Sequence, residues 1–532
     1  MGTIYSKPEP VDEKAGASNT TRSIKQEPGA AISMASETRL SFPFDPDPPF
    51  SRRFIDNIAA PPPYPFLAAR ERARSVAVPR LEDWSETLLS DSKNRLAISN
   101  FASQPYEALL TNRESLQSDL HIFNLAVPIE GGPITNQRSS GRCWLFAATN
   151  VFRVPLIKAY QLREFELSQA YLFYWDKIEK ANWFFEQIIA TADEDLTGRL
   201  IQKLLEDPVS DGGQWDMVVN LVQKYGLVPH AIYPDAYHAQ NSSRLNWLLT
   251  AKLREQALIL RKLATKKGDG QAAHLLAASK EQFLKEIHSI VTLLLGPAPN
   301  PDKEFVWQYY DSNGTSREVR KTPLEFGQQA TRSQTRILSR TSSPVSPGRL
   351  FSLVNDPRNE YNRLLTVDKL GNVLEGQALT YVNVEMSILK KAVIAMLKAG
   401  HPVFFGCDVG KFSNTKLGVM DADLTDLDLG FNVSLGMNKA ERLASGESSM
   451  THAMVITAVH LSDKDEPIRW RVENSWGEAA GEKGWFVMTD RWMDEYTFQA
   501  VVDFNFVSAE VRSVLKQTPQ VLPRWDPLGV LA

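Results

Sequence analysis

The stretch Gln137-Arg-Ser-Ser-Gly141-Arg-Cys143-Trp144 places a cysteine between a polar turn and an apolar run. Gly141 permits a tight turn, and residues 143–154 predict a helix that begins at the thiol. A helix N-terminus stabilises a thiolate through its unpaired N–H groups and its dipole, so we expect a lowered pKa for Cys143. The thiolate is the nucleophilic form, and the Gln137 amide can donate to a developing oxyanion. The stretch therefore predicts a catalytic cysteine rather than a structural one in a core helix.

Two further signals lie far downstream of this stretch. In Ser449-Met-Thr-His452-Ala-Met-Val-Ile456, His452 opens a strand-like run, and Arg471-Val-Glu-Asn474-Ser-Trp476-Gly477 contains Asn474. An imidazole can activate a thiol, and an asparagine can fix its tautomer as the third member of a triad. Trp476 would shield that bond from water. Taken singly, His452 fits a core histidine and Asn474 a turn residue, but the order Cys, His, Asn predicts a triad.

These residues resemble the active-site strings of papain-type cysteine peptidases. Longer strings resemble the bleomycin hydrolase branch of that family: Thr135 to Asn150, Phe165 to Tyr174, Asp211 to Gln214, Met450 to Met454 and Leu522 to Ala532. The resemblance runs from about residue 81 to the end of the sequence. It implies a papain-like fold and a cysteine peptidase that acts as an aminopeptidase on short peptides. It also implies hydrolysis of the bleomycin amide and of homocysteine thiolactone.

The pattern along the chain predicts an α+β fold, with helices first and strands later. Residues 1–79 are rich in proline and predict a disordered extension. We expect four further parts: a helical half with Cys143 (80–234), a helical and irregular insertion (235–395), a β-rich half with His452 and Asn474 (396–515), and a C-terminal arm (516–532). Within the insertion, residues 297–360 are rich in Ser, Pro and Arg and are expected to be irregular.

The insertion follows from the spacing of the predicted catalytic residues. Cys143 and His452 lie much farther apart than the ~130–150 residues typical of papain. In the resembled branch, such an insertion forms a hook that assembles six subunits into a barrel with inward-facing active sites. The resemblance therefore implies a homohexamer that restricts access to the thiol.

Two smaller features complete the expected site. Asp211-Gly212-Gly213 resembles the glycine pair that lets a substrate backbone approach the cleft, although a helix-breaking turn would use the same residues. Residues 516–532 contain prolines that exclude a helix, and they end in apolar side chains, which predicts an extended arm lying in a groove. The resemblance implies that the carboxylate of Ala532 meets the free α-amino group of the substrate. Since the sequence already stops there, we expect no trimming.

Composition narrows the class of protein. The 532 residues include 43% hydrophobic and 23% charged residues with a net charge of −4, which is ordinary for a soluble globular protein. Only two cysteines occur, which predicts a reducing compartment, the cytoplasm. Basic residues at 52–80 leave a mitochondrial address as the alternative. No apolar run reaches the ~20 residues of a membrane span, so we expect no membrane partner.

Other chemistries lack their motifs. Histidines show no pairing at metal-ligand spacing, and no H-E-x-x-H, G-x-S-x-G or Walker A string occurs, so we expect neither a metal nor another cofactor. Two alternatives stay open. The first is a catalytically idle hexamer that binds nucleic acid weakly through the basic spots at 261–267, 317–321 and 332–340. The second is an acyltransferase that uses the same triad.

Overall fold

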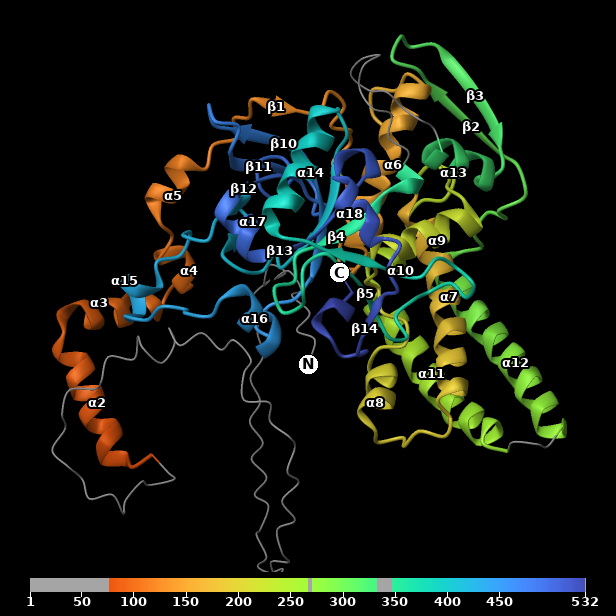
Figure 1. Ribbon diagram of the computed structural model, residues 1–532, viewed down its shortest axis with the longest axis horizontal. Helices are drawn as coiled ribbons and strands as arrows, with labels where there is room; N and C mark the ends of the chain where they lie inside the picture. The colour runs from red at the N-terminus through yellow and green to blue at the C-terminus, as the bar shows by residue number, and fades with distance from the viewer. Residues whose placement is uncertain (1–75, 267–269, 333–346, 532) are drawn as a thin grey trace, which may run out of the picture. The chain divides into compact units, whose positions relative to one another are not determined.

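The computed structural model describes residues 76–266, 270–332 and 347–531, so residues 1–75 of the expected extension lie outside it (Figure 1). The chain divides into two compact units between Ser99 and Asn100. In the first unit, residues 78–90 form α2 (Val78–Ser90), which has a proline in its first turn. Its large apolar side chains are exposed. α3 (Ser92–Phe101) follows and crosses the boundary.

Four helices of the second unit follow one another along the chain from the predicted nucleophile onward: α6 (Cys143–Ala159), α7 (Gln169–Ala190), α8 (Arg199–Glu206) and α9 (Trp215–Tyr225). α6 is apolar on nearly every side, and residues 143–157 are all buried, as befits a core helix. α7 is capped at its N-terminus by Ser168, whose hydroxyl accepts a hydrogen bond from the backbone N–H of Tyr171 (3.1 Å). Phe152 of α6 packs against Trp215 of α9 with ring centroids 5.3 Å apart, so these helices share one core.

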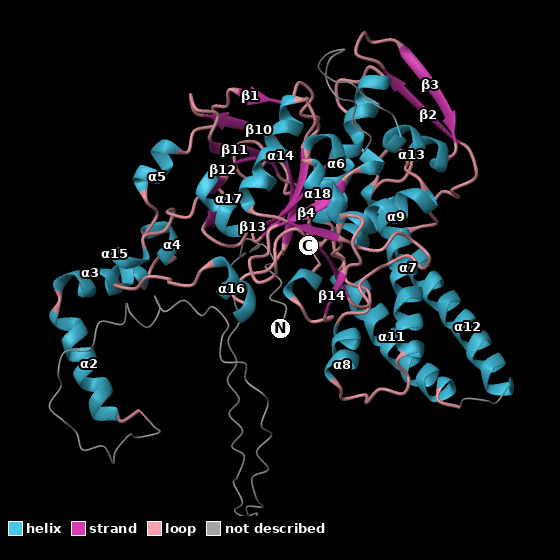
Figure 2. Ribbon diagram, viewed as in Figure 1, coloured by secondary structure: helices cyan, strands magenta, loops and turns pink. Residues whose placement is uncertain are grey.

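Within the described residues, twelve strands form the main sheet, in the order β14-β5-β6-β4-β13-β7-β10-β11-β12-β9-β8 with β1 paired to β10. Their bounds are β1 (Leu125–Ala126), β4 (Phe351–Val354), β5 (Arg363–Val367), β6 (Tyr381–Asn383), β7 (Val403–Cys407), β8 (Ser413–Asn414), β9 (Val419–Met420), β10 (His452–Leu461), β11 (Pro467–Glu473), β12 (Trp485–Thr489), β13 (Thr497–Val502) and β14 (Gln520–Leu522). α6 packs against β7 and β10, which brings the predicted nucleophile to the strand that begins at His452. α14 (Met386–Lys398) also packs on this sheet, near its centre (Figure 2).

The helical hairpin α11 (Ser243–Ala264) and α12 (Gly270–Leu295) lies against α7 (Figure 1). The prediction of irregular structure at 297–360 is wrong where β2 (Phe305–Tyr310), β3 (Ser316–Lys321), α13 (Pro323–Arg332) and β4 lie, and residues 333–346 of that range lie outside the described residues. β2 buries Phe305 and Trp307 against Phe326 of α13, while its alternate residues face outward. β3 is polar and mostly exposed, so only β2 shows the alternation of apolar and polar residues that would predict a strand.

Part of the range expected as an insertion belongs to the main sheet. β4, β5 and β6 all lie within residues 235–395, and β4 pairs antiparallel with β13. The helical and irregular character predicted for the insertion therefore fails for residues 351–354, 363–367 and 381–383. The remaining α-helices are α4 (Tyr106–Leu109), α5 (Arg113–Ser118), α10 (Tyr237–Gln240), α15 (Leu427–Phe431), α16 (Lys439–Ser445), α17 (Asp490–Tyr496) and α18 (Ala509–Val514). The predicted α+β class is confirmed.

Candidate active site

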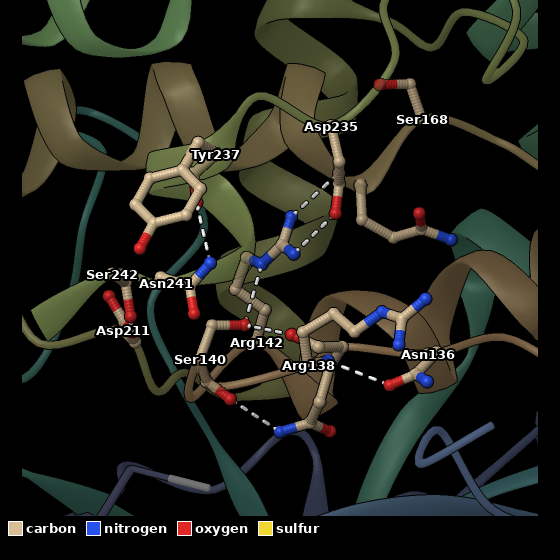
Figure 3. A network of polar contacts seen from close by, with 12 residues as sticks. Asn136, Arg138, Ser140, Arg142, Ser168, Asp211, Asp235, Tyr237, Asn241 and Ser242 are labelled. Atoms are coloured by element: carbon tan, nitrogen blue, oxygen red, sulfur yellow. Dashed lines mark hydrogen bonds and ion pairs between the residues drawn. The ribbon is translucent and has the colours of Figure 1, made fainter. Parts of the chain in front are cut away.

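Cys143 is the first residue of α6, and its side chain is buried. The turn before it is fixed by Arg142, whose guanidinium donates two hydrogen bonds to the Asp235 carboxylate (3.0 and 2.7 Å) and a third to Ser140 Oγ (2.9 Å). Figure 3 shows the Arg142–Asp235 pair beside the turn. Arg142 is itself fully buried, so the pair rigidly defines where the helix begins.

Gln137 is oriented from both ends of its side chain. Its Oε1 accepts a hydrogen bond from Ser475 Oγ (2.7 Å), and its Nε2 donates to the Ser140 carbonyl (2.6 Å). Its backbone N–H also donates to the Ser475 carbonyl (2.8 Å). A side-chain amide carries two N–H groups, so one is available for a further acceptor. Gln137 thereby connects the turn before the thiol with the residue that follows Asn474.

His452 and Asn474 form a buried pair. His452 Nε2 lies 2.9 Å from Asn474 Oδ1. The amide oxygen can only accept, so Nε2 carries the proton and Nδ1 is left as the acceptor. The Trp476 ring lies over the imidazole with centroids 4.8 Å apart, and it covers this bond. Behind it, Gly477 has φ of +76°, and a Cβ there would lie 2.4 Å from the Asn136 amide, so only glycine fits.

The fold brings the thiol to the imidazole strand. The backbone of Ala453, the residue after His452, lies close enough to the Cys143 sulfur to lower the pKa of the thiol, as do the backbone groups at the start of α6. Residues far apart in the sequence therefore meet at one point, where α6 begins and β10 begins. The structure also brings the second cysteine close, since Cys407 of β7 pairs in register with His452.

The expectation of a lowered thiol pKa is wrong for this buried site. Burial raises the pKa of Cys143 to about 11, although backbone hydrogen bonds at the helix start lower it. Burial likewise lowers the pKa of His452 to about 4, although the bond to Asn474 raises it. The cost of desolvating an isolated charge exceeds the stabilisation from the helix terminus. Burial thus favours the neutral thiol and the neutral imidazole over their charged forms.

The glycine pair lies directly against the nucleophile helix. A Cβ on Gly213 would lie 2.5 Å from the Trp144 ring, which gives this glycine a packing role in addition to the predicted substrate contact. Gly212 offers its carbonyl to Lys180 Nζ (2.6 Å). Gly212 and Gly213 are therefore buried against Trp144 and do not form an exposed turn.

The C-terminal arm ends beside the glycine pair, Gly212 and Gly213. Gln214, the residue after the glycine pair, donates from Nε2 to the Val530 carbonyl (2.8 Å). Leu528 is buried and Gly529 lies next to it in a short 3₁₀ turn. The predicted site residue Ala532 lies outside the described residues.

Sequence reasoning gave no role to several residues that hold this site. Ser475 orients Gln137, Asp235 pairs with Arg142, and the Asp211 carboxylate accepts the backbone N–H of Gly141 (3.0 Å). Lys177 is fully buried and binds Asp211 (2.7 Å). Asp211 and Ser475 lie inside the motifs that contain Gly212, Gly213 and Asn474, so those motifs could have identified them. No sequence pattern predicts that Lys177, on an aromatic helix, is buried.

The basic spots considered for nucleic acid are largely paired where the structure describes them. Arg261 is buried, and its guanidinium donates to the carbonyls of Thr191 and Glu194. Arg317 pairs with Asp311 (3.0 Å). Arg320 pairs with Glu318 (2.9 Å). Residues 333–340 lie outside the described ranges. In the described part of the chain, no helix is long and apolar enough to span a membrane.

Comparison with known proteins places this arrangement among its relatives. The family model of the peptidase C1-like family matches residues 75–529. Cysteine proteinase 1, mitochondrial, of Saccharomyces cerevisiae is 40% identical over 476 residues, covering 88% of this chain and 95% of that protein. Human bleomycin hydrolase is 45% identical over 430 residues, covering 79% and 90%. The crystal structure of PepW from Lactobacillus rhamnosis matches with a TM-score of 0.80 at 36% identity, covering 86% of this chain and all of that one.

Proposed function

Since the chain belongs to the peptidase C1-like family, with a papain-like fold and the activity of a cysteine peptidase, we propose that it is an aminopeptidase. In this proposal Cys143 is the nucleophile, His452 the base and Asn474 the residue that orients the base. The observation that carries these roles is the buried bond from His452 Nε2 to Asn474 Oδ1 (2.9 Å). It leaves Nδ1 as the proton acceptor on the strand whose backbone contacts the thiol.

The proposed reaction starts from the neutral pair. His452 Nδ1 accepts the proton from the Cys143 thiol as the sulfur attacks the substrate carbonyl. The Cys143 backbone N–H and the second N–H of Gln137 stabilise the oxyanion. The imidazolium then protonates the leaving amine, and the C–N bond breaks. Water, deprotonated by His452, finally hydrolyses the thioester and restores the thiol.

The pH dependence of kcat/KM follows from this starting state. His452 acts as a base only when it is unprotonated, and its pKa lies below the ordinary value, at about 4. Activity should therefore persist as the pH falls below 6.5 and disappear only near pH 4. The upper limb should lie near the thiol pKa of about 11. We expect a plateau between these limbs when kcat/KM is measured for the free enzyme.

Two substrates whose amino groups differ in pKa provide the control for this measurement. A limb that moves with the substrate belongs to the substrate, and a limb that stays belongs to the enzyme. An enzyme limb near pH 6.5 on the acidic side would contradict a buried, neutral His452.

The proposal of aminopeptidase action is supported by the position of the C-terminal arm. Its carbonyl at Val530 is fixed by Gln214, next to the glycine pair. A carboxylate at Ala532 would then bind the α-amino group of a substrate and limit how far the chain advances. Peptidase assays on a panel of free and N-blocked aminoacyl fluorophores test this directly: only the free-amine substrates should be cleaved at a substantial rate. Equal cleavage of both sets would contradict exopeptidase action.

The proposed substrates are short peptides, the bleomycin amide and homocysteine thiolactone. The name of the human relative supports the second of these. Each offers an acyl group that forms a thioester with Cys143. Product analysis with an added amine separates hydrolysis from acyl transfer by the same triad.

We also propose a homohexamer, with residues 235–395 supplying part of the contacts. Large apolar side chains are exposed on α11, including Trp247 (65%) and Leu248, and on α15, including Leu429 and Phe431. Such surfaces are typical of subunit contacts. Light scattering at micromolar concentration should give about 360 kDa, six times the chain mass of 59.7 kDa. A mass of one chain that does not change over a tenfold concentration range would contradict assembly.

The proposed location is the cytoplasm. Cys143 and Cys407, the two cysteines of the chain, are both free, which fits a reducing compartment. The relatives in Saccharomyces cerevisiae are named mitochondrial, which makes the mitochondrion the alternative.

A further inference from the structure

Asp211 contacts the residues on both sides of the nucleophile. Its carboxylate Oδ2 accepts the backbone N–H of Gly141 (3.0 Å), two residues before Cys143. Its backbone carbonyl accepts the indole N–H of Trp144 (2.6 Å), the residue directly after Cys143. A Cβ on Gly141 would lie 2.9 Å from the Asp211 Cβ, so the turn and this residue are in direct contact. One residue therefore fixes both flanks of the thiol.

The carboxylate of Asp211 is held by four donors. Lys177 Nζ (2.7 Å) and Asn246 Nδ2 (2.8 Å) donate to Oδ1, while Ser242 Oγ donates to Oδ2 together with Gly141. Figure 3 shows Asp211 and Ser242 beside the nucleophile turn. Burial opposes ionisation, but Lys177 and these hydrogen bonds hold the pKa of Asp211 well below its usual range. The side chain is therefore a fully satisfied buried anion.

Two buried lysines on α7 fix the loop that carries Asp211. Lys177 also donates to the Val209 carbonyl (2.5 Å). Lys180 donates to the carbonyls of Ser210 (2.7 Å) and Gly212 (2.6 Å), and it pairs with Asp176 (2.6 Å). The loop thus cannot shift without leaving buried charges unpaired, which is costly. Its rigidity passes to the nucleophile turn through Asp211.

We propose that Asp211, held by Lys177, is a positioning residue that fixes Gly141 and Trp144 so that the Cys143 sulfur and its backbone N–H face the substrate carbonyl together. This inference rests on the proposed role of Cys143. Neither cysteine of the chain is in a disulfide, so these polar contacts, and not a covalent cross-link, hold the two segments together. Asp211 itself touches no reacting atom in this proposal.

The charge of Asp211 separates positioning from electrostatic activation. A negative charge near the thiol raises the pKa of Cys143, so the carboxylate disfavours the thiolate. If charge alone mattered, removing it would increase reactivity. If position matters, removing one acceptor would lower turnover even though the thiolate forms more readily. The two readings predict opposite signs for the same substitution.

The test compares Asp211→Asn with the wild type and with Asp311→Asn. Asp311 is a matched control, because its buried carboxylate also accepts backbone N–H groups, from Asn313 and Thr315, and pairs with Arg317, in the β2–β3 turn. For Asp211→Asn we expect kcat to fall about 10-fold or more, with KM changed less than about threefold. Alkylation of Cys143 by iodoacetamide at fixed pH, located by mass spectrometry, should not slow. For Asp311→Asn, kcat should stay within about twofold of the wild type.

A kcat for Asp211→Asn within twofold of the wild type would overturn the inference, and so would a parallel loss of alkylation. If this variant does not fold, Ser242→Ala removes one donor to the same carboxylate without changing charge. That variant should lower kcat about threefold, and an unchanged kcat would overturn the inference equally. Failure of the proposed function is distinguishable, because it would appear in the wild-type enzyme as no hydrolysis.

Discussion

Cys143→Ala should lower peptide hydrolysis at least about 1,000-fold, because no other group in the site can form the thioester. The side chain is small and buried at the first position of α6, so alanine keeps the helix and its packing. Arg142, Gln137 and their partners do not bond through the thiol, and they should hold the turn unchanged. The measurement is the initial rate of fluorophore release by purified enzyme, with circular dichroism and light scattering to show intact fold and assembly.

The chain offers a matched control for this variant in Cys407, the second buried cysteine, which pairs in register with His452. Cys407→Ala removes an equal volume next to the site and should keep activity within about threefold. Asn474→Ala should lie between the two, with a loss of about 10- to 100-fold, since Asn474 orients His452 and makes no bond to substrate. Substantial turnover by Cys143→Ala would reject Cys143 as the nucleophile. Turnover by Cys143→Ala that disappears when Cys407 is also replaced by alanine would reject it in the same way.

The sequence predicts the components of the site better than their ionisation. Cys143, His452 and Asn474 each lie in a short local string, so their identity could be read without a fold. The pKa directions depend on how deeply α6 and β10 bury the pair, and burial is a tertiary property. The backbone groups at the helix start do lower the pKa of Cys143, as predicted, but burial raises it by more. Asp211 was visible only as the neighbour of two glycines, because its partner Lys177 lies 34 residues away.

The fold shows the same division between local and tertiary information. α6 and β10 have strong apolar patterns and were predicted close to their observed positions. β4, β5 and β6 are only three to five residues long, and they join the main sheet through β4, which pairs with β13 far along the chain. Short strands of this kind gain their stability from neighbouring strands rather than from their own sequence. A sequence pattern therefore cannot assign them to the sheet.

The C-terminal arm is anchored well before its last residues. β14 pairs in parallel with β5, Asp526 pairs with Arg358 (2.8 Å), and the Trp525 ring lies under the Arg199 guanidinium (4.4 Å). These contacts hold the arm on the second unit up to residue 526. The final residues then run on to Gln214, which fixes the Val530 carbonyl (2.8 Å) beside the glycine pair. Removing only the last four residues should therefore leave the arm in place and open its end.

Deletion of residues 529–532 should reverse the preference for a free amino group. Loss of a charge-assisted contact of about 1.5–3 kcal/mol should lower kcat/KM for free-amine substrates about 10- to 100-fold. Turnover of N-blocked and internal peptide substrates should rise, because the end of the arm no longer limits how far a chain can advance. Gln214→Leu, which loses only the bond to Val530, should shift the ratio of the two rates in the same direction by a smaller factor. If the truncated enzyme keeps the wild-type ratio, the arm does not measure the substrate, and the aminopeptidase preference must arise from another part of the cleft.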